Sequence, residues 1–86
     1  MAEVYILEGE DGRYYIGSTT DLARRLAQHQ SGHTWTTQRI KNPKLAFHQE
    51  YKTLEEARKI ELRLKKLKRK DYIKKIIKDG YIKIKI

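Results

Sequence analysis

Tyrosines gather near the N-terminus, and their phenols are the first side chains that could do chemistry in this chain. Tyr5 precedes a turn rich in Gly and Asp, and Tyr14 and Tyr15 follow it. Strand alternation places Tyr14 and Tyr15 on opposite faces, and Tyr5 shares the face of Tyr15 only if the hairpin loop has an odd number of residues or a bulge. Gly17 leaves that face bare, so a phosphate or another backbone could approach closely. The alternative is that these tyrosines pack the sheet, as strand aromatics usually do.

A cationic pair follows on the first predicted helix. At about 100° per residue, Arg24 points away from the apolar Leu22, whereas Arg25 lies at the edge of the buried stripe. His29 lies one turn beyond Arg25, so both side chains project from the same helix edge. The structural alternative is a boundary pair in which the arginine stem covers apolar surface.

Glu61 is the most informative acidic residue. On its predicted helix it falls inside the arc of apolar positions, between Ala57 and Leu54. A carboxylate turned toward a core is costly unless it is paired or binds a cation. The pattern leaves two readings open, a metal ligand or a salt bridge, and the candidate partners of the salt bridge are Arg58, Lys65 and Arg25.

Composition limits the partners and the metal. The formal net charge is +9, and the excess lies in residues 63–86. This segment contains eleven Lys or Arg but only two acidic residues, Asp71 and Asp79. A one-sided basic cluster is typical of a protein that binds a polyanion, and a solvated helix face is the alternative. The chain has no cysteine, so the available ligands favour a hard ion such as magnesium. We see no membrane span and no signal peptide, and we expect a cytoplasmic protein.

These residues must be positioned by a small α/β (α+β) domain that occupies residues 1–86. Periodicity predicts a hairpin, a helix, a third strand and two further helices, in the order β-β-α-β-α-α. Residues 32–42 are expected to form a loop, and 81–86 a short tail. The third strand, 43–51, should carry Leu45, Phe47 and Tyr51 on one face. The expected architecture is a three-stranded, mainly antiparallel sheet flanked by helices. The predicted helices begin near Asp21, Thr53 and Asp71, and the apolar stripe of the second comprises Leu54, Ala57, Ile60, Leu64 and Leu67.

The order and spacing of these residues resemble those of the GIY-YIG endonuclease superfamily, and most closely its small stand-alone bacterial proteins. The resemblance covers about residues 3–78. Its motifs are Glu-Val-Tyr at residues 3–5, Tyr-Ile-Gly at 15–17, and then Arg25, His29 and Glu61. Each motif alone is short, and their combination is specific. The family's first glycine is replaced by Glu3, and a downstream asparagine found in several relatives has no counterpart.

The resemblance implies a metal-dependent endonuclease that hydrolyses phosphodiester bonds in DNA, in repair or recombination. Tyr5 and Tyr15 would flank the scissile phosphate, and of the two we favour Tyr5 as the general base. Arg25 would stabilise the transition-state charge, and His29 would hydrogen-bond a tyrosine or relay its proton. Glu61 would hold a single divalent ion, magnesium or manganese.

Substrate binding is expected from Gly17, which would make room for the DNA backbone, and from the basic residues Lys65, Lys66, Lys68, Arg69 and Lys70. Phosphodiester chemistry is compatible with RNA as well as DNA, and a protein partner could supply specificity. His33, Trp35 and His48 receive no role. Two other functions fit the sequence. One is a non-catalytic nucleic-acid-binding module that retains the fold, and the other is an adaptor whose lysine-rich face binds an acidic protein.

Overall fold

The computed structural model describes residues 1–30, 43–67 and 70–82, and within them it has the predicted order of elements. The strands and helices are β1 (Ala2–Glu8), β2 (Tyr14–Thr19), α1 (Leu22–Gln30), β3 (Lys44–Tyr51), α3 (Leu54–Leu67) and α4 (Lys70–Asp79). The expected loop at 32–42, most of the expected tail at 81–86, and Lys68 and Arg69 lie outside the described residues. No helix in the described ranges is long and apolar enough to span a bilayer.

The sheet is antiparallel with β1 in its centre and the order β2-β1-β3, which confirms the predicted architecture. Glu8 pairs with Tyr14, so the hairpin loop comprises residues 9–13. Gly12 adopts a φ of 80° in this loop, a conformation that glycine takes without steric cost. The loop has an odd number of residues, and therefore Tyr5 and Tyr15 lie on the same face of the hairpin. In the register Tyr5 is opposite Gly17, and Leu7 is opposite Tyr15.

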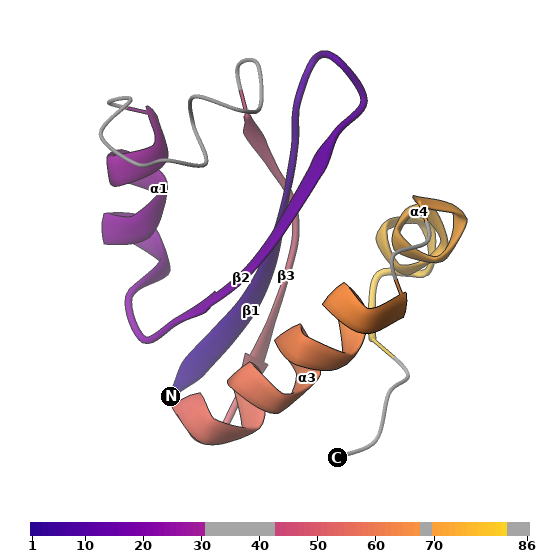
Figure 1. Ribbon diagram of the computed structural model, residues 1–86. Coiled ribbons are helices and arrows are strands. Elements are labelled where there is room, and N and C mark those ends of the chain that lie inside the picture. Colours follow the sequence, from indigo (N-terminus) through magenta and orange to yellow (C-terminus); the bar gives the residue numbers. More distant parts are fainter. Residues whose placement is uncertain (31–42, 68–69, 83–86) are drawn as a thin grey trace.

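The hydrophobic core lies between the sheet and α3. Figure 1 shows α3 running across the sheet, with α4 beyond it and α1 on the other side of the strands. The side chains that alternate with the tyrosines point into this core. Its most deeply buried members include Val4, Ile6, Ala57, Ile60 and Leu64, and α4 contributes Ile73 and Ile76. The segment after α4 is tied to β3 because the amide of Ile82 donates to Gln49 Oε1 at 2.7 Å.

The prediction for the third strand was wrong at one residue. Phe47 pairs with Ile6 on the core side, but Leu45 pairs with Leu7 because a β-bulge shifts the register between these pairs. One extra residue reverses the side-chain alternation. Leu45 is therefore 38% exposed and does not share the face of Phe47. Leu67 also departs from the predicted stripe, since it lies exposed at the end of α3.

Two helices begin with the caps that the sequence predicts, whereas α4 begins at Lys70, so Asp71 lies in its first turn and not before it. Asp21 Oδ1 accepts a hydrogen bond from the amide of Arg24 at 3.1 Å. Thr53 Oγ1 accepts one from the amide of Glu56 at 3.2 Å. Both are N-cap contacts that satisfy amides without a partner inside the helix. These caps fix where α1 and α3 start, and so set which of their side chains face the sheet.

Two leucines of α3 allow a matched test of this packing. Leu64 is 1% exposed and Leu62 is 60% exposed. Leu64→Ala should lower the free energy of unfolding by about 2–5 kcal/mol, because it leaves a cavity in the core. Leu62→Ala should change it by less than about 0.5 kcal/mol. Urea unfolding followed by circular dichroism measures both, and equal losses would contradict this placement of α3.

Candidate active site

Two tyrosine rings form the centre of the candidate site. The ring centroids of Tyr5 and Tyr15 are 6.1 Å apart, with an interplanar angle of 46°. Tyr5 is 1% exposed, whereas Tyr15 is only partly buried. Tyr5 comes from the central strand, and Tyr15 comes from the edge strand β2. The pair therefore presents one enclosed phenol and one accessible phenol at the border of the sheet.

Gly17 makes this pairing possible. A Cβ atom at this position would lie 2.5 Å from Tyr5 Oη, 2.6 Å from Tyr5 Cζ and 3.0 Å from Tyr15 Cε2. Such distances are below ordinary contact, so any larger residue would displace the rings. The atoms that approach Gly17 closely in the structure belong mainly to the side chain of Tyr5, whereas the sequence suggested a phosphate or a backbone. That Gly17 also makes room for a DNA backbone stays a prediction.

Glu61 lies on α3 at the rim of the core, and both of its carboxylate oxygens are engaged. Ser18 Oγ donates to Oε1 at 2.5 Å, and Lys65 Nζ donates to Oε2 at 2.8 Å. The Glu61 side chain is 17% exposed, as expected for a position inside the apolar arc. Of the three cations that the sequence offered as partners, Lys65 makes the salt bridge. The carboxylate of Glu61 is therefore held in one orientation against β2.

Ser18 is the contact that the sequence analysis missed. It alternates with Ile16 on the core-facing side of β2, directly opposite Val4. A hydroxyl at such a position needs a polar partner, and that need was the available signal. Ser18 is also the first of four residues at 18–21 whose side chains can all cap a helix, so its type alone did not indicate a tertiary contact. In the structure, Thr19 and Asp21 carry out that local function, because Thr19 Oγ1 accepts from the amide of Asp21 at 3.1 Å.

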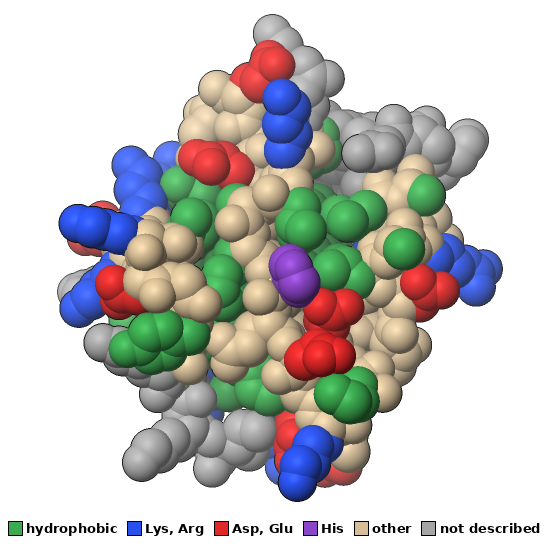
Figure 2. Space-filling view, turned by 180° about the vertical axis from the view of Figure 1, so that it is seen from behind, with side chains coloured by type: hydrophobic (Ala, Val, Ile, Leu, Met, Phe, Trp, Pro, Cys, Tyr) green, Lys and Arg blue, Asp and Glu red, His purple; other side chains and the backbone are tan. Residues whose placement is uncertain are grey.

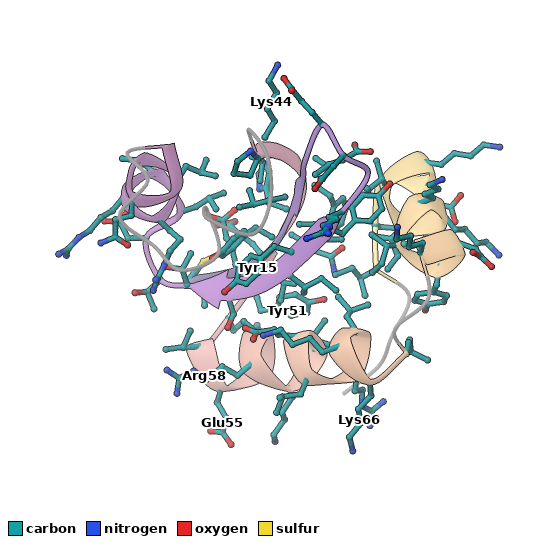
Figure 3. All side chains as sticks on the ribbon, turned by 45° about the horizontal axis from the view of Figure 1, so that its top comes forward. Tyr15, Lys44, Tyr51, Glu55, Arg58 and Lys66 are labelled. Atoms are coloured by element: carbon teal, nitrogen blue, oxygen red, sulfur yellow. The ribbon has the colours of Figure 1, made fainter. Side chains whose placement is uncertain are left out.

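The two halves of the site meet through Lys65 and Tyr15. The Lys65 ammonium lies 5.7 Å from the centroid of the Tyr15 ring, within the range of a cation–π interaction. Tyr15 lies on the face of the edge strand β2 that is opposite to the core, and Lys65 reaches its ring from α3, whereas Lys66 points away from the sheet (Figure 3). Of the basic residues expected to bind substrate, Lys65 is thus brought to the tyrosines. Lys66 and Lys70 are exposed elsewhere.

Burial controls the protonation of Tyr5. It raises the pKa of the Tyr5 phenol well above its ordinary value of 10.0, and the neighbouring Tyr15 and Glu61 raise it further. Arg25 lowers this pKa, which places the guanidinium within electrostatic range although its side chain is exposed. Arg25 therefore favours the ionised phenol, but desolvation has the larger effect on this pKa. Without a bound ligand Tyr5 is a protonated hydrogen-bond donor.

The remaining predicted residues are only partly placed. His29 belongs to α1, but its side chain, like Lys68 and Arg69, lies outside the described residues. His48, which had no predicted role, pairs with Glu3 through Nδ1 and Oε1 at 2.8 Å. Figure 2 shows a histidine side chain beside acidic side chains on the face opposite to the view of Figure 1. That surface does not suit a polyanion.

The donor set at Glu61 suits a hard divalent ion. Within the described ranges, no group of three or more His, Cys, Asp or Glu side chains could hold a metal by itself. The site offers instead the Glu61 carboxylate beside the Ser18 hydroxyl. Magnesium is commonly bound through one or two carboxylates together with water and substrate phosphates. The residues fit an ion shared between Glu61 and a phosphate.

Comparisons with known proteins show what this chain is similar to. The family model of the GIY-YIG catalytic domain matches residues 1–76. A UPF0213 protein of Streptococcus pneumoniae serotype 4 is 48% identical over 69 residues, covering 79% of this chain and 70% of the relative. A UPF0213 protein of Halobacterium salinarum is 40% identical over 70 residues, covering 80% and 91%. The solution NMR structure of a UPF0213 protein of Bacillus halodurans is similar with a TM-score of 0.58 and 34% identity, covering 93% of this chain and 87% of that chain.

Replacement of Gly17 tests the tyrosine packing. Gly17→Ala should destabilise the fold by about 1–3 kcal/mol, because the new methyl group must displace the Tyr5 ring. It should also shift the NMR signals of the Tyr5 and Tyr15 rings. Gly12→Ala is the control for the tyrosine signals, since its Cβ would meet nothing within 4 Å, although an alanine is strained at the positive φ of this position. Unchanged tyrosine signals in Gly17→Ala would contradict the packing.

The raised pKa of Tyr5 gives a prediction for alkaline pH. An unfolded chain releases this phenolic proton near pH 10, whereas the folded chain retains it. The unfolded state then binds fewer protons, so stability is fully present below about pH 10 and falls as pH rises further. Tyr5→Phe should show a shallower fall of the free energy of unfolding above this pH. Parallel curves for the wild type and the variant would refute the assignment.

Proposed function

The chain belongs to the GIY-YIG family, which is a family of nucleases, and from that premise we propose that it is a divalent-metal-dependent endonuclease acting on DNA. The observation that carries the proposal is the convergence of Glu61, Tyr5 and Tyr15 at the border of β2. A carboxylate suited to a hard cation lies there beside phenols able to contact a phosphate. The proposed reaction is hydrolysis of a phosphodiester bond.

Glu61 is the proposed metal ligand. Its orientation is fixed by Ser18, so the carboxylate need not reorganise when an ion arrives. The bound ion, magnesium or manganese, would polarise the phosphate and neutralise charge on the leaving oxygen. This contact would hold the substrate against β2, where Tyr15 is accessible.

The phenols and the arginine have distinct proposed roles. Tyr5, held protonated by burial, is suited to donate a hydrogen bond that orients the phosphate or the Tyr15 hydroxyl. As a general base, the role that the sequence favoured, Tyr5 would need additional positive charge to overcome that burial. Arg25 would supply a fixed positive charge toward the transition state. For His29 we retain the proposed hydrogen bond or proton relay to a tyrosine.

DNA is the proposed substrate because the basic charge is concentrated beyond Glu61. The exposed cations of the described part of this region include Lys66, Lys70, Lys74, Lys75 and Lys78. They can contact phosphates without reading base edges, so we expect preference for a DNA shape, as in repair or recombination, and steep weakening with salt. The same charge favours the second candidate function, a binding module without catalysis, and RNA would fit it equally.

Cleavage assays with matched variants test the proposal. Plasmid, single-stranded and branched DNA are incubated with Mg²⁺, with Mn²⁺ or with chelator. Glu61→Gln should lose cleavage by about 10²-fold or more and keep DNA binding, because the transition state loses its metal. Glu55→Gln is the control on the same helix, since Glu55 is 80% exposed and pairs only at 3.6 Å with Lys59.

Arg25→Ala and Arg24→Ala form the second matched pair. Both arginines are exposed neighbours on α1, but only Arg25 contributes to the Tyr5 pKa. Arg25→Ala should therefore slow cleavage much more than Arg24→Ala. Wild-type protein that binds these DNAs but cuts none of them with either metal would identify a binding module instead.

A further inference from the structure

Lys65 pairs with Glu61 Oε2, the carboxylate oxygen that the hydrogen bond from Ser18 leaves for a metal ion. Its ammonium lies 2.8 Å from Oε2, while Oε1 is already engaged by Ser18 at 2.5 Å. The carboxylate is only 17% exposed. A divalent ion approaching Oε2 therefore meets a cation already in place, and two cations cannot share one oxygen at contact distance without strong repulsion.

A second ion pair on α3 has the same sequence spacing as Glu61 and Lys65 but a longer distance between its charged atoms. Lys59 and Glu55 have the same spacing, but their charged atoms are 3.6 Å apart and Glu55 is 80% exposed. Pairs of that kind are largely screened and contribute little. Glu61 differs because β2 covers it and Ser18 fixes its orientation. Its pairing with Lys65 is correspondingly shorter.

The Lys65 ammonium can keep a favourable contact after it leaves the Glu61 carboxylate. Its side chain is 46% exposed, and its ammonium lies 5.7 Å from the centroid of the Tyr15 ring. The aromatic face can retain a cation that has left the carboxylate. When an ion displaces Lys65 from Glu61, the ammonium therefore stays within the site, and no buried charge is left without a partner.

We propose that Lys65 is the resident cation of Glu61, which holds the carboxylate in place in the metal-free protein and sets the divalent-ion concentration needed to load the site. This inference rests on the proposed function only in taking Glu61 as the metal ligand. Lys65 is in this sense a positioning residue that discriminates against weakly binding cations. A neutral side chain at this position would leave Oε2 open to the ion.

Direct measurement of Mn²⁺ binding tests the proposal without requiring cleavage. Free Mn²⁺ is followed by electron paramagnetic resonance for the wild type, Lys65→Met and Lys59→Met. Lys65→Met should bind Mn²⁺ on the order of fivefold more tightly, the scale of a partly exposed ion pair. Lys59→Met removes the same charge from the same helix and should change the affinity by less than about twofold, because exposed charges are screened.

Two further variants complete the design. Lys65→Arg keeps the competing cation and should restore an affinity close to that of the wild type. Glu61→Gln in the Lys65→Met background should abolish the tight binding, which locates the ion on Glu61. Lys65→Gln serves as a second neutral variant, and thermal unfolding reports whether each protein is folded.

The outcomes separate this inference from the nuclease proposal. Tighter Mn²⁺ binding by Lys65→Met, lost with Glu61→Gln, supports the role of Lys65 even if no DNA is cut. Equal or weaker binding by both neutral variants overturns that role even if the wild type cuts DNA. An equal gain in Lys59→Met also overturns it, because net charge alone would then explain the effect.

Discussion

The hydrogen bond between Ser18 and Glu61 is the contact on which the candidate site depends. It joins β2 to α3 across 43 residues of sequence and fixes an acidic side chain against a strand. Without that partner, a carboxylate at this rim of the core would carry a desolvation cost with only Lys65 to offset it. With it, α3 is oriented so that Glu61 and Lys65 lie beside Tyr15, while Ile60 and Leu64 fill the core.

The tyrosine pair imposes the second constraint, which is that residue 17 must have no side chain. Tyr5 is fully enclosed, yet its phenol must reach the same border as Tyr15, and the space for it exists only because Gly17 has no side chain. The five-residue loop at 9–13 brings these residues to one face. Burial then keeps the Tyr5 pKa high, and Arg25 opposes that effect without overcoming it. Packing and protonation at the site are thus consequences of one local arrangement.

Local periodicity was enough to predict the order of elements, the caps of α1 and α3, and the position of Glu61 inside the apolar arc, because these depend on neighbours in sequence. It also gave the condition under which Tyr5 and Tyr15 share a face, although not whether the loop met it. What could not be predicted depends on tertiary register. The bulge that turns Leu45 outward shifts the strand by one residue, and no pattern within the strand marks it. The partner of Glu61 likewise required knowing how α3 crosses β2, and Lys65 was one of three equivalent choices until that crossing was defined.

If the carboxylate fixed by Ser18 binds a divalent ion beside the tyrosines, substoichiometric Mn²⁺ should reveal it through paramagnetic broadening of the amide NMR signals. We expect broadening centred on Ser18, Glu61 and Lys65, extending to Tyr15, and its loss in Glu61→Gln. Broadening centred on another acidic group, such as Glu3 and Glu50 on adjacent strands, or broadening that persists in Glu61→Gln, would show that the ion binds elsewhere.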